Sequence, residues 1–198
     1  MSFAGADSNS EWNDSEFNDA EYDATETAEY LLSLEPELVV EGATKLQTLL
    51  YYAQGIYLQM YGCALFVDPI QACEKGPAIP IIEKKIENQE LKPKGKNESV
   101  LPFAVQMFLD DIFDQFYKDA LQLSDKTHEA KSWCQAYQKG KNTRLLRSDI
   151  EEDFESVAYD FTQGRMLIHD KEILFAPCPI HWNESEVSNV PTTESFWY

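Results

Sequence analysis

Carboxylates and histidines are the side chains in this sequence that could carry acid–base or metal chemistry, and their spacing favours neither. Four aspartates gather along one expected helix: Asp110, Asp111, Asp114 and Asp119. Because apolar residues recur between them at helical spacing, we interpret these acids as the solvated face of that helix. The three histidines are far apart in the sequence: His128, His169 and His181. His128 has no metal-binding or catalytic pattern around it and is expected to be a packed, hydrogen-bonded structural histidine.

The cysteines are scattered in the same way. They are Cys63, Cys73, Cys134 and Cys178, and no two of them form a C-x-x-C pair. Each lies among apolar or aromatic neighbours, which predicts reduced thiols in a cytoplasmic protein. The sequence also lacks a nucleophile elbow, a P-loop, a dinucleotide glycine pattern and an H-E-x-x-H motif. We therefore expect a non-enzymatic protein with no catalytic residues, metal or cofactor, although proximity of the histidines in the fold would leave catalysis open.

Composition limits the partners that this chain can have. Its 198 residues suit one domain with tails, and a hydrophobic share of 43% is enough for a core. The net charge of -19 argues against binding to nucleic acid or to an anionic membrane surface, and it favours a basic protein partner. No stretch approaches the ~20 apolar residues that span a bilayer, and no cationic, apolar leader opens the sequence. We expect a cytoplasmic protein.

The elements that position these residues are predicted to be helices. Apolar residues at three- and four-residue spacing predict helices over 25–34, from about 43 to 62, from 80 to about 86, over 99–123 and over 124–138. Thr25 is a candidate N-cap, Gly62 is suited to end its helix, and Ser148-Asp149-Ile150-Glu151 resembles a capping box for a last helix that ends at Gly164. A further short helix, beginning at Asp68-Pro69, is expected to include Ile70, Ala72 and Cys73.

The longest helix is expected over 99–123. Its predicted apolar stripe comprises Val100, Phe103, Ala104, Met107, Phe108, Ile112, Phe113, Phe116 and Ala120. Leu49, Ala53, Phe108, Ile112 and Phe154 are expected to be buried. In the last helix, Val157 and Phe161 are expected to face inward. After it, Met166–His169 and Glu172–Phe175 flank Asp170-Lys171 and could form a short hairpin.

Residues 87–98 have almost no apolar content and are expected to form a loop. Lys92, Lys94 and Lys96 make it the densest positive charge in the chain. We expect an exposed, flexible loop; the alternative is that it docks the acidic tail of the same chain or an anionic surface of a partner.

Several motifs resemble the Panacea domain family, which includes the SocA-like antitoxins and the phage-associated GepA-like proteins. Its opening motif is matched by Lys45-Leu46, Tyr51-Tyr52-Ala53-Gln54-Gly55, Gly62, Leu65-Phe66, Asp68-Pro69-Ile70, Ala72 and Gly76-Pro77. Its second motif is matched by Leu123-Ser124, Thr127-His128 and Trp133. Its first and last helices are matched by Ala28–Leu32 and by Ser148-Asp149-Ile150 with Phe154. The chain departs from the family pattern at Cys73, where an aromatic residue is usual, and at Lys75, which replaces a frequent Tyr.

The resemblance implies an all-α, compact multi-helix domain over 24–163. The acidic extension over 1–23 and the irregular or hairpin extension over 164–198 are not part of the resemblance and are inferred from composition. The resemblance also implies that Trp133 packs near His128. For function it implies an antitoxin that neutralises a toxin by direct stoichiometric contact. The alternatives are a phage or mobile-element protein that inhibits a host nucleic-acid enzyme by acidic surface mimicry, and a protease adaptor for a toxin.

The acidic N-terminal segment is our candidate for the partner-binding site. No Lys or Arg interrupts its acids, and aromatic residues recur at every fifth position. Such a segment is typical of a disordered solubilising tail, but its aromatic residues could anchor it in a basic groove. The candidate residues are Trp12, Asp14, Glu16, Phe17, Asp19, Glu21 and Tyr22.

Overall fold

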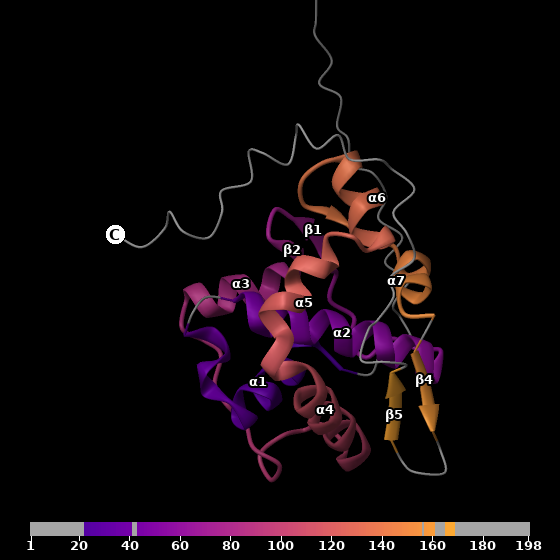
Figure 1. Cartoon of the computed structure of the whole chain (residues 1–198). Coiled ribbons are helices and arrows are strands. Elements are labelled where there is room, and N and C mark those ends of the chain that lie inside the picture. Colours follow the sequence, from indigo (N-terminus) through magenta and orange to yellow (C-terminus); the bar gives the residue numbers. More distant parts are fainter. Residues whose placement is uncertain (1–21, 41–42, 156, 161–164, 169–198) are drawn as a thin grey trace, which may run out of the picture.

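The computed structural model describes residues 22–40, 43–155, 157–160 and 165–168, and it is mostly helical (Figure 1). The helices are α1 (Ala24–Leu34), α2 (Thr44–Tyr61), α3 (Pro80–Glu87), α4 (Phe103–Phe116), α5 (Ala120–Thr127), α6 (Lys131–Lys139) and α7 (Arg147–Asp153), with the short 3-10 turns η2 (Pro36–Val39) and η3 (Tyr117–Asp119). The strands are β1 (Gln71–Cys73), β2 (Gly76–Ala78), β3 (Thr143–Arg144), β4 (Val157–Asp160) and β5 (Arg165–Ile168).

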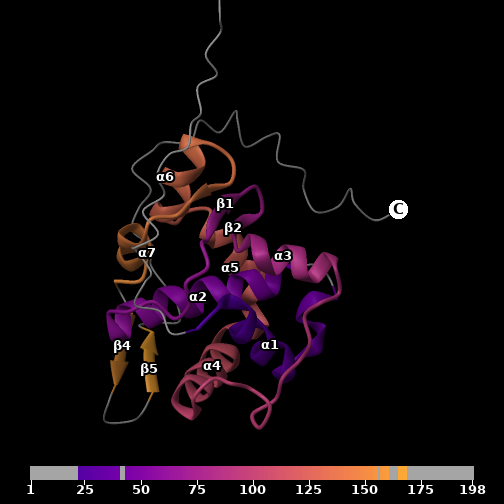
Figure 2. The ribbon, with the colours of Figure 1, turned by 180° about the vertical axis from the view of Figure 1, so that it is seen from behind.

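Helix α2 is the centre of the fold. It crosses the middle of the molecule in both Figure 1 and Figure 2, with the other helices arranged around it. Its side chains are buried almost all round, as expected of a helix with neighbours on every side. Gly62 ends it with a φ of 69°, and the Gly62 N–H donates to the Leu58 carbonyl at 2.8 Å. The predicted start near residue 43 and the predicted end at Gly62 are confirmed.

Two glutamines of α2 bind the backbone of neighbouring segments through their side-chain amides. Gln47 accepts from the Ile79 N–H at 2.9 Å and donates to the Ile79 carbonyl at 3.2 Å. Gln54 accepts from the N–H groups of Leu65 and Phe66 at 3.0 and 3.1 Å and donates to the Phe66 carbonyl at 3.1 Å. Each buried side-chain amide therefore both accepts from and donates to main-chain groups, as the backbone of an adjacent β-strand would.

The segment after Asp68-Pro69 is a strand, and the prediction of a short helix there is wrong. β1 pairs with β2 in an antiparallel hairpin, with Cys73 opposite Gly76, and β3 joins the other edge of β1. A helix could not continue through Gly76-Pro77. The extended backbone instead finds partners in β3 and, at Ile79, in Gln47. The all-α prediction therefore holds for most of the described residues, but it missed this small sheet.

Helix boundaries in the middle of the chain also differ from the prediction. The expected helix over 99–123 is interrupted, because α4 begins after Pro102 and η3 separates it from α5. Ser124 lies inside α5 and does not cap a new helix. α1 is capped by Asp23, not by Thr25: Asp23 and Glu26 form a reciprocal capping box.

The buried face of α4 is narrower than the predicted stripe. Phe108 and Ile112 are buried as predicted, as are Leu49, Ala53 and Phe154. Val100, Phe103 and Met107, however, are exposed. The inward residues of α4 follow the helical period from Val105, so the predicted stripe combined two faces of one helix.

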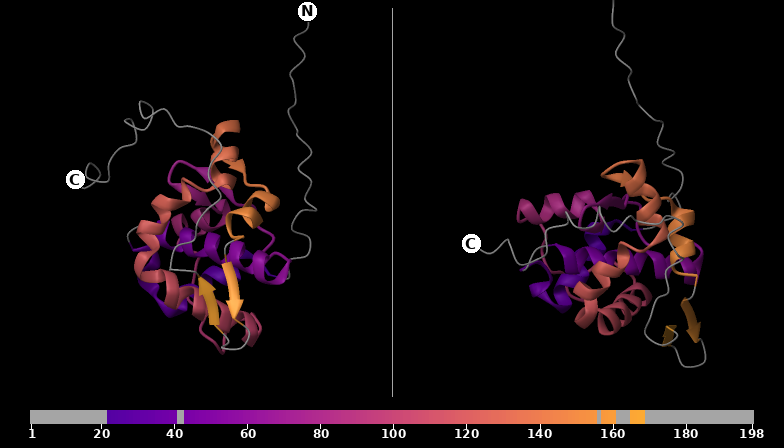
Figure 3. Two further views of the ribbon diagram at one scale, coloured as in Figure 1. Left: turned by 45° about the vertical axis from the view of Figure 1, so that its right-hand side comes forward. Right: turned by 45° about the horizontal axis from the view of Figure 1, so that its top comes forward.

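The last predicted helix is also shorter than expected. α7 ends at Asp153, with Leu146 at its N-cap and no side-chain cap from Ser148. Val157 begins β4, which pairs with β5 in an antiparallel hairpin at one side of the helical body (Figure 3). The expected hairpin partner at 172–175 lies outside the described residues, as do Phe161 and Cys178.

Candidate functional site

The motif residues of α5 and α6 hold the turn of the β1–β2 hairpin. The two ring nitrogens of His128 lie 3.2 Å from the Glu74 carbonyl and 3.3 Å from the Asp125 carbonyl. Its ring packs edge-on against Trp133, with 4.6 Å between centroids. The Trp133 indole N–H donates to the Cys73 carbonyl at 3.0 Å. The predicted contact of His128 with Trp133 is confirmed, and the hydrogen bonds agree with a structural role for His128, which stays a prediction.

Gly76 lets the hairpin approach α5 closely. Its φ is 109°, and a Cβ there would lie 2.9 Å from the Thr127 hydroxyl oxygen. That hydroxyl donates to the Ser124 carbonyl at 2.7 Å, so it is already engaged inside the helix. Pro77 follows in a buried position. Gly76, Pro77 and Thr127 therefore act together to pack β2 against α5.

A cavity of about 150 Å³ lies between this hairpin, the first turn of α2 and α5. It is lined by Ala43, Thr44, Gln47, Thr48, Cys73, Lys75, Gly76, Pro77, Ala78, Glu83, Ser124 and Thr127. Partial burial and then the nearby Glu87 carboxylate raise the pKa of Glu83, although the positive charge of Lys75 acts in the opposite direction. Burial and then Glu83 raise the pKa of the Cys73 thiol. A thiol whose pKa is raised stays protonated, so Cys73 has the opposite of the environment that activates a nucleophile.

The other motif residues hold the scaffold together. Leu46, Tyr52, Gln54 and Phe66 are buried in the core, and Lys45 lies in the first turn of α2. Asp68 accepts from the Ala24 N–H at 2.7 Å, so it supports the start of α1 from a distance in the sequence. Pro69 is exposed before β1.

The predicted partner-binding residues Trp12, Asp14, Glu16, Phe17, Asp19 and Glu21 lie outside the described residues. Tyr22 is described, and it lies where the domain begins. It forms a parallel bridge with Phe66, and its carbonyl accepts from the Val67 N–H at 3.2 Å. Its side chain packs partly buried against the core.

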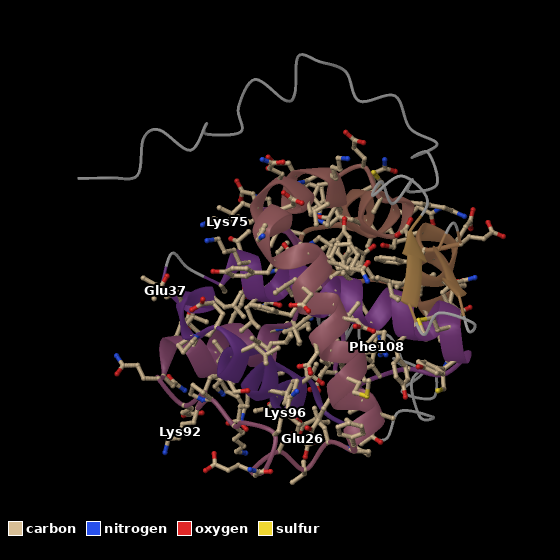
Figure 4. The ribbon with its side chains drawn as sticks, turned by 60° about the horizontal axis from the view of Figure 1, so that its bottom comes forward. Glu26, Glu37, Lys75, Lys92, Lys96 and Phe108 are labelled. Carbon is tan, nitrogen blue, oxygen red and sulfur yellow. The ribbon has the colours of Figure 1, made fainter. Side chains whose placement is uncertain are left out.

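The basic loop is tied to the domain itself. Lys94 forms an ion pair with Glu29 of α1 at 2.5 Å, and its N–H donates to the Glu29 carbonyl at 3.0 Å. Lys96 forms an ion pair with Asp110 of α4 at 2.7 Å. The hydrogen bond to Glu29 raises the pKa of Lys94. Figure 4 shows Lys92 and Lys96 along this loop, and the loop therefore runs over α1 and α4.

Two further features were missed by sequence reasoning. Lys75 and Glu83 both line the cavity. Lys75 lies in the turn of the hairpin and Glu83 lies in α3, so no short sequence motif could have predicted that they are close. The exposed apolar face of α4 was also missed, although the spacing of Phe103 and Met107 from Asp110 and Asp114 could have indicated it. Within the described part of the chain, no group of three or more His, Cys, Asp or Glu is placed to hold a metal ion.

Comparison with known proteins gives one match. The family model described as antitoxin SocA-like, Panacea domain, matches residues 46–134. That segment runs from within α2 into α6 and contains the β1–β2 hairpin, α4 and all of the cavity lining except Ala43 and Thr44. No curated protein and no solved structure matches. Among the described residues, no helix has the length and apolar character needed to cross a bilayer.

Proposed function

We propose that the chain is a cytoplasmic, non-enzymatic antitoxin that neutralises a toxin by direct stoichiometric binding, because residues 46–134 match the family model described as antitoxin SocA-like, Panacea domain. The family match is the observation that carries this proposal. The environment of the motif residues supports it. His128, Trp133 and Gln54 are engaged with backbone carbonyls, and the pKa of the Cys73 thiol is raised.

The partner is proposed to be a basic protein, either a toxin or a nucleic-acid enzyme. A net charge of -19 attracts a basic protein over a long range and speeds its association. The same charge disfavours direct binding to nucleic acid, since such binding depends on cations that neutralise phosphates.

The acidic N-terminal segment is proposed to form part of the binding surface. Ordering it on a partner costs about 1–2 kcal/mol per backbone residue. Charges are screened beyond about 8 Å at physiological salt, so the acids alone would not offset that cost. Because Tyr22 already packs against the domain, Trp12 and Phe17 would have to bury apolar area on the partner as well.

Two sets of substitutions separate these contributions. Replacing Trp12 and Phe17 by Ala should mainly raise the dissociation rate from the partner. The second set replaces the four nearby acids by Asn or Gln, and these acids are Asp14, Glu16, Asp19 and Glu21. It should mainly lower the association rate and reduce the salt dependence of that rate. A matched control neutralises four exposed acids of the domain: Glu87, Asp125, Glu129 and Glu155. If both N-terminal variants bind as the unchanged chain does, the segment is only a solubilising tail.

The experiment that tests the proposal is affinity capture with the full chain from its source cells, followed by expression of the captured protein alone and together with the chain. An antitoxin predicts that the captured protein arrests growth, that the chain restores growth, and that the purified complex has a fixed stoichiometry. A captured protein whose activity and toxicity are unaffected by the chain would contradict the proposal.

The extreme negative charge also favours a second candidate, an inhibitor from a phage or mobile element that mimics the phosphate backbone. That function predicts that DNA or RNA competes with the chain for the captured enzyme. A protease adaptor makes a third prediction: the partner would disappear in a protease-dependent manner instead of accumulating as an inactive complex.

A further inference from the structure

Helix α4 presents to solvent a face that is apolar in its first turns and acidic in its later ones. Phe103 is 70% exposed and Met107 is 51% exposed, and Val100, just before the helix, is 67% exposed. Residues four, seven and eleven apart lie on one side of a helix, so Asp110 and Asp114 continue the side that Phe103 and Met107 begin. Large apolar side chains that gather on one exposed face mark interaction sites more often than isolated ones do.

The core does not require this face. The opposite side of α4, with Val105, Phe108, Leu109, Ile112 and Phe116, is buried against the rest of the domain. Phe108 lies between α4 and α2 (Figure 4). The half-exposed ring of Tyr61, at the end of α2, lies 6.3 Å from the Phe108 ring on that buried side. The core contacts of α4 are therefore made without Val100, Phe103 and Met107.

The charge beside this surface is strongly negative. Asp114 is exposed, and Asp110 already accepts a hydrogen bond from the Tyr30 hydroxyl at 2.8 Å while it forms an ion pair with Lys96. From Phe103 to Asp119 the sequence contains four aspartates and one cation, Lys118. A ligand for this face must therefore combine apolar groups with positive charge.

We propose that the outward face of α4, defined by Val100, Phe103, Met107 and Asp114, docks a basic amphipathic segment of the partner protein. Apolar side chains of that segment cover Phe103 and Met107, and its Lys or Arg side chains lie against Asp114. This inference rests on the proposed function, because it identifies a second surface through which the chain binds its partner.

Charge selects this occupant over the chain's own tails and over a second copy. Residues 1–21 contain no Lys or Arg, and residues 169–198 contain one Lys against five acids. Either tail would bring further negative charge to Asp110 and Asp114. A symmetric dimer through this face would place the same acids of two copies near each other, because a two-fold interface pairs each patch with itself. A basic partner alone relieves the repulsion.

The test uses the full chain and a fluorescein-labelled synthetic helix made of Leu and Lys, in which the lysines lie on one face. Two control peptides replace Lys by Glu or Leu by Ser. Binding is measured by fluorescence anisotropy, and hydrogen exchange locates the protected residues. We expect the Leu/Lys peptide to bind most tightly and to protect residues 100–114.

Substitutions on the chain then assign the binding to the surface. F103S/M107S should weaken binding by about tenfold or more, as loss of central apolar anchors does. D114N should weaken it less, and the loss should shrink as salt is added. The matched control is V40S, since Val40 is 73% exposed and lies on another part of the chain. It should bind within about twofold of the unchanged chain, and circular dichroism checks that each variant stays helical.

Several results would overturn the inference. Protection outside α4, equal binding of the Leu/Glu peptide, or unchanged binding by F103S/M107S would each do so. Concentration-dependent dimerisation that protects α4 would assign the face to a second copy, and tighter peptide binding after removal of residues 1–21 or 169–198 would assign it to a tail. If F103S/M107S neutralises the captured partner as well as the unchanged chain does, the α4 surface is wrong and the proposed function stands. If the unchanged chain neutralises no partner, the proposed function fails whatever the peptide does.

Discussion

Replacing Asp153 by Ala should destabilise the fold strongly, because its buried carboxylate joins α2, α6 and α7. One carboxylate oxygen accepts from the Lys131 N–H at 2.8 Å, and the other accepts from the Ser132 N–H at 3.2 Å and from the Tyr51 hydroxyl at 2.9 Å. The Tyr51 hydroxyl also lies 3.0 Å from the Ser132 hydroxyl. Asp153 thereby supplies the cap that Ala130 does not give to α6.

The magnitude follows from the donors that would be left without an acceptor. Each buried donor that loses its partner costs about 1–3 kcal/mol, and the three share one acceptor group, so their costs do not simply add. We expect Asp153→Ala to lower the free energy of unfolding by about 3–5 kcal/mol. Tyr51→Phe should cost about 1.5–3 kcal/mol, because the two backbone donors keep their acceptor. The double variant should cost less than the sum of the two.

Urea unfolding of the full chain, followed by circular dichroism, measures these free energies. The control is Asp125→Ala, an exposed aspartate of α5 that should change stability by no more than about 0.5 kcal/mol. A cost below about 1 kcal/mol for Asp153→Ala, with an unchanged denaturant slope, would refute the reasoning.

The pH dependence of the same residue has a definite sign. Burial raises the pKa of Asp153, although its hydrogen bonds with Ser132, Tyr51 and Lys131 act in the opposite direction. The folded chain therefore binds this proton more tightly than the unfolded chain does. Its contribution to stability is largest below the ordinary aspartate pKa and declines as pH rises through the raised folded value. Asp153→Asn should lack that decline when compared with the unchanged chain at each pH.

Three further changes test the packing and the thiols. Gly55→Ala should destabilise the fold by about 1–3 kcal/mol or more, because its Cβ would lie 2.1 Å from the Phe154 ring; thermal melting should show partial relief when Phe154→Leu is added. Phe108→Ala should cost about 3–5 kcal/mol in urea, and a near-neutral result would contradict its place in the core. A thiol titration of the denatured chain should find all four cysteines reduced, and metal analysis should find no stoichiometric zinc; either a shortfall or bound zinc would overturn the sequence interpretation.

Local patterns were sufficient where local physics decides the structure. The helical spacing from Leu46 onward and the glycine at position 62 predicted α2. A buried helix shows closely spaced apolar residues, and a left-handed end favours glycine, so both features can be recognised in a short stretch of sequence. The same holds for α3, whose first residue is Pro80.

Distant contacts explain most of what was missed. The hairpin after Asp68 depends on Gln47 and on β3, which are far from it in the sequence. Asp68 supports α1 across 44 positions, so the local pattern could suggest a cap but not which helix it serves. At the candidate site, the contact of His128 with Trp133 came from the family resemblance, whereas the cavity requires the fold to bring its walls together.

The two glutamines of α2 have a consequence for how such a domain can diversify. Gln47 and Gln54 bind Ile79, Leu65 and Phe66 only through main-chain N–H and carbonyl groups. Every amino acid except proline offers those groups, so the anchorage does not depend on which side chains the anchored segments carry. Mutations in the exposed stretches next to them, such as Val67 or Glu74-Lys75, can therefore change the surface without releasing the segment from its place. Homologous proteins that keep the two glutamines can therefore vary their surface residues while the backbone of these segments stays in place. A deep mutational scan should find Gln47 and Gln54 far less tolerant of substitution than those exposed neighbours.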